Sequence, residues 1–371
     1  MIYDAIVIGV GGMGSATLYH LARRGAKVLG IEQFDIPHDF GSSHGETRII
    51  RLAYAEHPDY VPLLRRAYQL WRELESAGGE RLLLITGGID AGAPESATIK
   101  GSLLACEMHQ LPHEVLTAAQ LHRRFPGYRL PSEMVAIFQP DGGFLLPERC
   151  IVNHVQASGA EVRTRERVTG WDRYEGGVKV WTDRASYTAR KLVITAGPWV
   201  ASLLPRLAAL AIPERQVMLW AQPLRPELFQ PAAFPVFNME GPERFYGYPI
   251  YGVPGFKIGK YHHRLEKTDP DRVDREIHPE DEEVLRDGIR RFFPDADGPS
   301  ITMKTCLFTN SPDEHFILDL HPDAPEVAVA AGFSGHGFKF CSVIGEIMAD
   351  LALDGATPHN IGLFRLGRFE S

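Results

Sequence analysis

The sequence has few cysteines and no long apolar run. Its four cysteines (Cys106, Cys150, Cys306 and Cys341) lie far apart and form no C-x-x-C pair, which argues against a zinc site or a disulfide framework. No stretch of 18 apolar residues occurs, so we expect no membrane span. The first predicted strand begins at residue 2 and leaves no room ahead of it for a signal peptide. We therefore expect a cytoplasmic protein.

The sequence also lacks a block of basic residues. Its net charge is −8, and no cluster of Lys and Arg could follow a phosphate backbone, so we expect no nucleic-acid partner. A hydrophobic content of 44% and a charged content of 23% are ordinary for a globular protein. The 371 residues suffice for two domains. Because no heptad pattern or long apolar edge requires a partner chain, we expect a monomer.

The chain opens with a motif that is typical of dinucleotide binding. The apolar run Ile2–Ile8 leads into Gly9-Val10-Gly11-Gly12-Met13-Gly14, and a helical pattern follows over Ser15–Arg24. In such a turn Gly9 permits the tight bend, Gly11 lets the backbone approach a phosphate, and Gly14 lets helix and strand pack closely. The helix N-terminus then offers backbone N–H groups and a positive dipole end to a pyrophosphate.

A second apolar run, Lys27–Ile31, ends in the acidic residue Glu32, which lies 23 residues after Gly9. A carboxylate at this position accepts hydrogen bonds from ribose hydroxyls, and it favours a ribose with free hydroxyls over a 2′-phosphate. The motif and its context predict a dinucleotide but leave FAD and NAD open.

The order of segments favours FAD. From Leu82 the sequence changes to short β-like runs. Apolar strands that end in small-residue turns, as in a dinucleotide-binding fold, return at Lys191–Gly197 and again at Val327–Gly337. A nicotinamide enzyme usually completes its site in one block, whereas a second glycine-rich turn near the C-terminus suits a longer cofactor. We predict an α/β (α+β) fold with two interleaved domains: a Rossmann-like FAD-binding domain (1–82, 145–212 and 317–371) and an antiparallel β-sheet substrate domain (83–144 and 213–316).

Several basic residues are candidates for substrate binding. Arg51 and Lys339 could pair with a substrate carboxylate if the ends of the nucleotide domain meet over the cofactor, although surface positions are an equal alternative. Period-two alternation places Lys257 with Tyr261 on one strand face and His262 on the other. A buried Lys257 would supply positive charge near a flavin, whereas solvated strand-edge charges are the alternative.

Two further patterns have structural alternatives. The pair His262 and His263 could suggest a metal, but no acidic or cysteine partner lies at suitable spacing, so we expect no metal site. Cys306, in the β-like run Lys304–Thr309, is either a small buried hydrophobe or a nucleophile bonded to the cofactor, and its spacing does not decide between them.

Together these segments resemble a known family. The resemblance runs nearly end to end to the monomeric sarcosine oxidase family, which includes N-methyl-L-tryptophan oxidase, within the D-amino acid oxidase-like flavoenzymes. Besides the first glycine turn, the segments that carry it are Gly41-Ser42-Ser43-His44-Gly45-Glu46-Thr47-Arg48, Lys304-Thr305-Cys306, Ser311-Pro312-Asp313-Glu314-His315-Phe316 and Gly332-Phe333-Ser334-Gly335-His336-Gly337-Phe338-Lys339-Phe340.

The resemblance implies roles for particular residues. Cys306 would hold the 8α-methyl group of FAD in a thioether, Arg51 and Lys339 would bind the substrate carboxylate, and Lys257 would promote reaction with oxygen. Tyr246 and His262 would line the substrate side. The residues that would contact the cofactor are Gly9, Gly11, Gly14, Glu32, Ser42, His44, Thr47, Arg48, Cys306, Gly335, Gly337 and Lys339, and Arg48 would also act in catalysis.

The sequence departs from the family pattern at two places. Phe308 stands where these sarcosine oxidases usually carry Tyr, and the segment after Lys257 is one residue longer, so that the histidine role could fall on His263. The resemblance implies a flavin-dependent oxidase of N-methyl or other secondary α-amino acids that uses O2 and produces H2O2. N-methyltryptophan, pipecolate or proline as the substrate, a dehydrogenase with another electron acceptor, and a non-catalytic dinucleotide-binding regulator remain alternatives.

Overall fold

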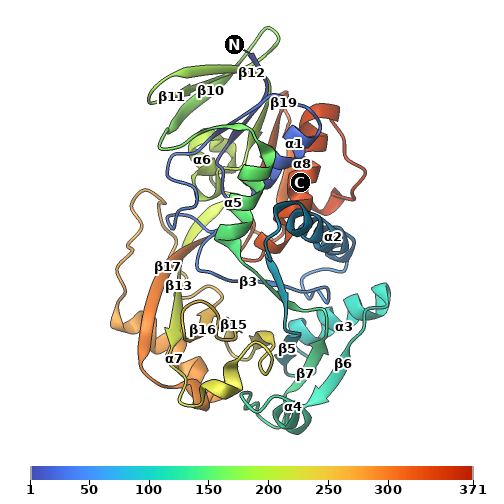
Figure 1. Ribbon diagram of the computed structural model, residues 1–371, viewed down its shortest axis with the longest axis vertical. Coiled ribbons are helices and arrows are strands. Elements are labelled where there is room, and N and C mark those ends of the chain that lie inside the picture. Colours follow the sequence, from blue (N-terminus) through green and yellow to red (C-terminus); the bar gives the residue numbers. More distant parts are fainter. Residues whose placement is uncertain (1, 370–371) are drawn as a thin grey trace.

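A computed structural model describes residues 2–369, and within this range the chain forms two large β-sheets joined by a small one (Figure 1). The first sheet has the order β10-β11-β12-β1-β2-β9, and β19, which carries β18, also pairs with β12. Its strands are β1 (Ile2–Ile8), β2 (Val28–Ile31), β9 (Glu161–Arg163), β10 (Val168–Tyr174), β11 (Gly177–Thr182), β12 (Ser186–Ile194), β18 (Ile317–His321) and β19 (Ala324–Ala331).

The second sheet has the order β17-β13-β16-β15-β14-β5-β7-β6. Its pairings are antiparallel except between β14 and β5, which run parallel, so the expectation of an antiparallel sheet is wrong for that one pair. Its strands are β5 (Gly88–Gly92), β6 (Glu114–Thr117), β7 (Val135–Gln139), β13 (Ile212–Ala221), β14 (Val236–Glu240), β15 (Arg244–Tyr248), β16 (Phe256–Lys260) and β17 (Ser300–Asn310).

A three-stranded sheet with the order β3-β8-β4 lies where the chain passes between the two large sheets. Its strands are β3 (Arg48–Ile50), β4 (Leu83–Ile85) and β8 (Gly143–Leu145). The first sheet draws its strands from three separated parts of the chain, as the interleaved fold predicts. The domain boundaries themselves stay a prediction.

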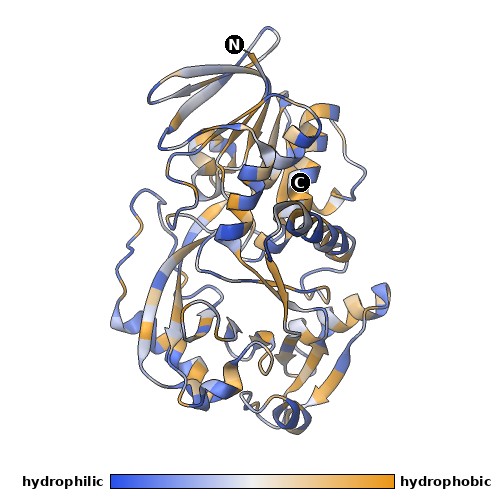
Figure 2. Ribbon diagram, in the orientation of Figure 1, coloured by the Kyte–Doolittle hydropathy of each residue, from blue (hydrophilic) through white to orange (hydrophobic). Residues whose placement is uncertain are grey.

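Helices cover the large sheets. They are α1 (Gly12–Arg23), α2 (Tyr60–Gly78), α3 (Ala97–His109), α4 (Ala118–Arg124), α5 (Pro147–Ser158), α6 (Val200–Leu203), α7 (Pro279–Phe292) and α8 (Cys341–Asp354). Figure 2 shows α8 as largely hydrophobic and α2 with a hydrophilic outer face. The α1 and α8 helices meet closely, because a Cβ on Gly345 would lie 2.6 Å from the Cβ of Ala16. This packing brings the N-terminal and C-terminal segments of the chain together.

Local signals predicted most of the elements that position the cavity. The apolar pattern predicted over 58–76 is α2, and the residue after the helix, Gly79, has a φ of +69°, a conformation that favours glycine. The run from Lys257 to His263 is shorter as a strand than expected. β16 ends at Lys260, and His262 has a φ of +52°. The chain therefore turns directly after Tyr261.

Candidate functional site

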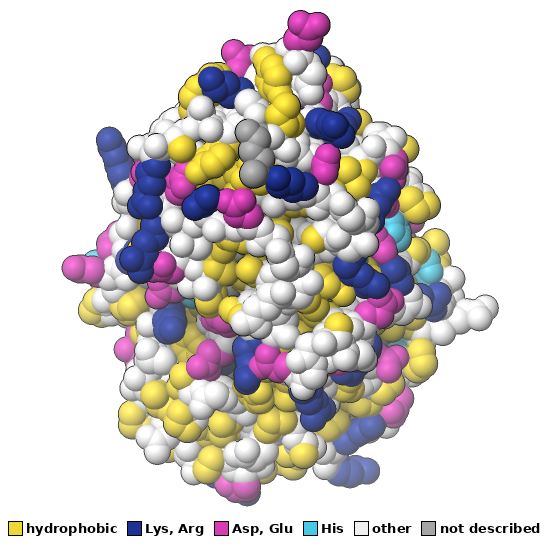
Figure 3. All heavy atoms as spheres, turned by 45° about the horizontal axis from the view of Figure 1, so that its top comes forward, with side chains coloured by type: hydrophobic (Ala, Val, Ile, Leu, Met, Phe, Trp, Pro, Cys, Tyr) yellow, Lys and Arg dark blue, Asp and Glu magenta, His cyan; other side chains and the backbone are white. Residues whose placement is uncertain are grey.

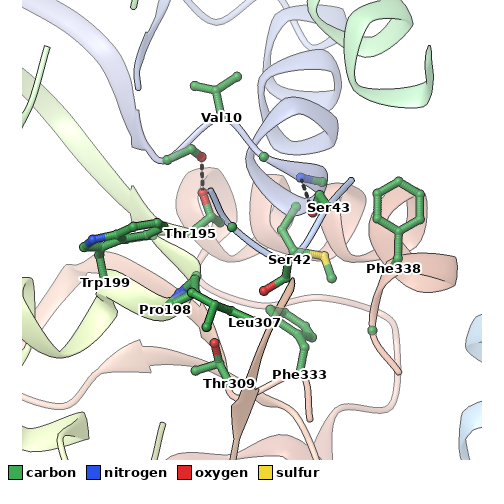
Figure 4. Close-up of a pocket in the computed structure, with 18 of the residues that line it drawn as sticks. Val10, Ser42, Ser43, Thr195, Pro198, Trp199, Leu307, Thr309, Phe333 and Phe338 are labelled. Atoms are coloured by element: carbon green, nitrogen blue, oxygen red, sulfur yellow. Dashed lines mark hydrogen bonds between the residues drawn. The ribbon is translucent and has the colours of Figure 1, made fainter. Parts of the chain in front are cut away.

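A large cavity lies between the two sheets. It contains about 1670 Å³ of empty space, its open mouth included, and segments from both ends of the chain and from its middle line it. Figure 4 shows side chains from the 41–48 loop, β17 and the Phe333–Phe338 segment around a common space, with the glycine turn beside it. The cavity brings together ten of the predicted site residues: Gly9, Gly11, Glu32, Ser42, Arg48, Tyr246, Cys306, Gly335, Gly337 and Lys339.

The first glycine turn has no room for side chains. A Cβ on Gly14 would lie 1.8 Å from the carbonyl oxygen of Gly9, and a Cβ on Gly9 would lie 2.6 Å from the carbonyl oxygen of Thr195. Gly9 also has a φ of +85°, which side chains rarely adopt. Beside this turn, Ser43 Oγ accepts a hydrogen bond from the Gly12 N–H at 3.3 Å. Gly9, Gly11 and Gly12 line the cavity, so the start of α1 lies at its wall, where phosphate binding requires it.

Glu32 lies at the carboxyl end of β2 and lines the cavity, as its spacing from the glycine turn predicted. Its carboxylate accepts hydrogen bonds from Val10 N–H at 2.8 Å and from Phe34 N–H at 3.1 Å. Each bond uses one oxygen atom, and a carboxylate has about four acceptor positions. Acceptor positions therefore remain for ribose hydroxyls.

The 41–48 loop is held by charged side chains. Glu148 accepts hydrogen bonds from the backbone of Gly45 at 2.6 Å and Glu46 at 3.1 Å. Lys257 Nζ donates to the Gly45 carbonyl at 2.6 Å and to the Thr47 carbonyl at 3.1 Å, while Arg48 Nη2 donates to the Ser42 carbonyl at 3.0 Å. Burial, with a further contribution from Arg48, lowers the pKa of Lys257 well below its ordinary value. An anion close to Lys257 would favour its charged form.

Arg51 and Lys339 both contact the ring of Tyr54. Arg51 Cζ lies 4.6 Å and Lys339 Nζ 5.2 Å from the ring centroid. Burial, with a further contribution from Arg51, lowers the pKa of Lys339 to about 7. Lys339 lines the cavity, whereas the guanidinium of Arg51 is held behind it by Glu56 at 3.0 Å and Asp90 at 3.7 Å. Arg51 and Lys339 thus lie close together, as predicted, and Arg51 is paired with two carboxylates of the protein.

Aromatic rings form the wall beside Cys306. Tyr261 packs against Tyr246 with ring centroids 5.1 Å apart and against Phe308 at 6.0 Å. Cys306 is 2% exposed, and Arg48 Nη2 lies 3.6 Å from its sulfur. Burial raises the pKa of Tyr246 well above its ordinary value, so Tyr246 is a neutral hydrogen-bonding group.

The structure does not bring His262 or His263 into the cavity lining. Instead, the preceding residue, Tyr261, lies there. His262 lies between Glu214 at 3.1 Å and Glu314 at 3.0 Å. Hydrogen bonds to these two carboxylates raise its pKa to about 9. The turn that begins after Tyr261 explains the difference.

Other expectations concern metals and surfaces. Within residues 2–369 no group of three or more His, Cys, Asp or Glu side chains is arranged to hold a metal ion. No helix in the same part of the chain is long and apolar enough to cross a membrane. On the face shown in Figure 3, acidic and basic side chains are interspersed over the surface.

The comparisons with known proteins agree with this geometry. The family model described as FAD dependent oxidoreductase (DAO) matches residues 4–351. The chain belongs to this family. This FAD-dependent oxidoreductase is 43% identical to the monomeric sarcosine oxidase of Streptomyces avermitilis over 98% of this chain and 96% of the relative. It is 36% identical to the N-methyl-L-tryptophan oxidase of Yersinia pestis over the whole of both chains. The solved structure of NikD, described as an unusual amino acid oxidase, has a TM-score of 0.84 and 27% identity, and covers 98% of this chain and 97% of NikD.

Buried polar atoms of the oxidoreductase fit its cofactor. Among the described residues, neither ring nitrogen of His44 has a hydrogen-bond partner, and the same holds for Thr309 Oγ1, whose residue lines the cavity. Burial, together with Arg48, lowers the pKa of His44 well below its ordinary value, so the ring is neutral and can donate and accept. The cradle at Gly9 and Gly14 and these free polar atoms match a cofactor with a pyrophosphate, hydroxyls and ring heteroatoms.

Four polar residues near the cavity of the oxidoreductase were not predicted: Asp90, Asn238, Arg244 and, as a cavity residue, Tyr261. The Tyr261 hydroxyl donates to Asn238 Oδ1 at 3.3 Å, and Asn238 Nδ2 donates to Asp90 Oδ1 at 3.2 Å. Asp90 is 4% exposed. An acidic residue inside the β-like run Gly88-Ile89-Asp90-Ala91-Gly92 was the signal that could have identified Asp90.

Proposed function

We propose that the protein is an FAD-dependent oxidase of N-methyl or other secondary α-amino acids, with dioxygen as the electron acceptor and H2O2 as a product. The observation that carries this proposal is the placement of Lys339 and Arg51 around Tyr54, at the cavity that begins at the glycine turn. The relatives named as oxidases of sarcosine and of N-methyl-L-tryptophan support the substrate class.

FAD, when bound, supplies a two-electron acceptor for oxidation of the substrate C–N bond. Glu32 would bind its ribose, and the glycine turn and the N-terminus of α1 would bind its pyrophosphate. Cys306, buried in the cavity wall, would hold the flavin as a thioether. His44, Thr47, Gly335 and Gly337 would complete the cofactor contacts, together with Ser42 and Arg48.

The protein's own groups orient the substrate. Lys339 and Arg51 bind the substrate carboxylate. When it binds, Arg51 gives up its ion pair with Glu56 and pairs with the substrate carboxylate instead. Tyr246, Tyr261 and Phe308 exclude water from the reacting carbon. The product imine hydrolyses to an aldehyde and an amine, which for sarcosine are formaldehyde and glycine.

Lys257 promotes reaction with oxygen because a positive charge beside the cofactor stabilises reduced oxygen species. Its position between the rings of Trp220 (5.0 Å) and Tyr248 (4.4 Å) supports this role, because a poorly solvated cation interacts strongly with nearby charge. In Lys257→Met, reoxidation of the reduced enzyme by O2 should slow far more than its reduction by substrate. Equal slowing of the two steps would contradict the role.

A panel of secondary amino acids with peroxide detection tests the function. One peroxide per substrate consumed supports an oxidase. Substrate consumption with an artificial acceptor but without peroxide would indicate a dehydrogenase instead. The absence of a reaction with any secondary amino acid would overturn the proposal.

A further inference from the structure

Arg244 is a cation at the substrate side that the sequence motifs did not identify. It lies two residues from Tyr246 on β15, so that both side chains project from the same face of the second sheet. Its guanidinium lies over the ring of Tyr261, with Cζ 4.4 Å from the centroid, and Tyr261 lines the cavity. Arg244 is therefore one aromatic ring away from the space that a substrate occupies.

Arg244 and Arg51 share one carboxylate. Glu56 Oε1 lies 3.1 Å from Arg51 Nη2 and 2.9 Å from Arg244 Nη2, so these two nitrogen atoms are at most 6.0 Å apart. Although burial opposes its charge, the two arginines hold the pKa of Glu56 well below its ordinary value. The separation suits two oxygen-bearing groups joined by a short carbon chain, with one on each arginine.

Three hydrogen-bond donors among the described residues of this region have no partner. Within residues 2–369, Arg51 Nε, Arg244 Nε and Gln139 Nε2 are buried without a hydrogen-bond partner. Gln139 belongs to the same region, because its Oε1 accepts hydrogen bonds from the N–H groups of Leu52 at 2.8 Å and Ala53 at 3.0 Å. Buried unpaired donors are costly, and a ligand that brings oxygen acceptors relieves that cost.

The surroundings leave space for such a group. Arg244 and His315 line a groove whose acidic lining residues are Glu56, Glu240, Glu243, Asp313 and Glu314. Because Tyr261, beneath Arg244, lines the main cavity, the guanidinium lies between the cavity and the groove. A substrate side chain that extends from the cavity toward the groove passes Arg244.

We infer that Arg244 determines specificity by binding an oxygen acceptor, carboxylate or carboxamide, at the end of the substrate's side chain. Arg51 and Lys339 bind the α-carboxylate of the same molecule. The substrate class is then N-methylated or other secondary amino acids of the aspartate, asparagine, glutamate or glutamine type. This inference rests on the proposed function.

Specificity ratios test the inference. The holoenzyme is assayed for peroxide with sarcosine and with the N-methyl derivatives of aspartate, asparagine and leucine, because leucine matches the other two side chains in shape but has no acceptor. The ratio of kcat/KM for the aspartate or asparagine derivative over the leucine derivative should be about tenfold or more, since a hydrogen bond to a charged group discriminates by at least that factor. A ratio near one would overturn the inference.

Variants test whether the two kcat/KM ratios depend on Arg244. Arg244→Met should bring both ratios to about one or below. In Arg244→Lys the charge remains without the planar fork, so the aspartate ratio should persist while the asparagine ratio falls. The matched control is Arg291→Met, an exposed arginine paired with Glu243 and Asp287, which should keep both ratios. If Arg244→Met lowers kcat/KM for every substrate by the same factor, Arg244 only holds Glu56 and the inference is wrong.

A binding measurement separates this inference from the proposed function. Succinate, which has two carboxylates, should raise the Tm of the wild type more than butyrate at equal concentration, and Arg244→Met should remove the difference. If no amino acid in the panel is oxidised, the proposed function fails, and the Tm comparison still decides whether Arg244 binds a second oxygen-bearing group. Equal shifts by the two acids in the wild type would overturn the inference.

Discussion

Lys339 provides a prediction whose magnitude follows from the structure. Its ammonium contacts the ring of Tyr54 and the carbonyl of His336 at 2.6 Å, and its pKa is lowered to about 7 by burial first and by Arg51 next. At pH 8 only about one-tenth of the free enzyme then carries the charge on Lys339. Affinity for a carboxylate should therefore fall as the pH rises above about 7.

The size of the effect can be bounded. A hydrogen bond from a charged group contributes about 1.5–3 kcal/mol, so the Kd of a carboxylate should rise about 10- to 150-fold between pH 6 and pH 10. Since one pKa unit corresponds to about 1.4 kcal/mol, binding should raise the pKa of Lys339 by about one to two units and take up a proton. The Kd should accordingly rise steeply just above pH 7 and level off above the raised pKa.

Propionate is a suitable ligand, because it has no amine whose own titration would obscure the result. Its Kd is measured with the holoenzyme from flavin absorbance at half-unit steps from pH 6 to pH 10. In Lys339→Met the dependence should disappear, whereas Lys100→Met, an exposed lysine paired with Glu95, should retain it. A Kd that does not change with pH in the wild type, or the same rise in Lys339→Met, would refute the reasoning.

Three other predictions follow from local geometry. Gly14→Ala places a Cβ 1.8 Å from the Gly9 carbonyl, so the purified variant should have lost most of its flavin absorbance. The control Gly170→Ala, whose Cβ meets no atom of the described residues within 4 Å, should keep its flavin absorbance. Normal flavin content in Gly14→Ala would contradict the role of the glycine turn in cofactor binding. Cys306→Ala should leave no yellow colour with acid-precipitated protein, and retained colour would place the attachment elsewhere. The pKa of His262 is raised to about 9, so the stabilisation of the fold by its charged ring is fully present below about pH 6.5 and is lost as the pH rises through 9. His262→Gln should therefore lower Tm at pH 6 more than at pH 10. Equal losses of Tm at the two pH values would show that the charge of His262 is unimportant.

The nucleotide half of the site could be predicted because its signals are local. Gly9, Gly11 and Gly14 follow one strand at fixed spacing, and Glu32 follows at the end of the next strand, so spacing alone indicated the motif. The second glycine segment, Gly332–Gly337, could also be identified from the sequence, but its role depended on the inference that the two ends of the chain meet. The packing of α1 on α8, with Gly345 against Ala16, brings the two ends together.

The substrate side could not be predicted in the same way. Whether His262 or Tyr261 faces the cavity depends on where β16 ends, and a shift of one residue reverses the face of every following side chain. The partnership of Arg244 with Glu56 joins residues 188 positions apart, and no local pattern encodes it.

By itself the sequence determined the glycine turn, the position of Glu32 after the second strand and the interleaved order of the two sheets, because these depend on residues that are neighbours along the chain. Only the tertiary structure decided which basic groups share a carboxylate, which ring lines the cavity and which donors remain free. Those properties arise from side chains on different strands, and the pairing of the strands, rather than their composition, sets the distances between them.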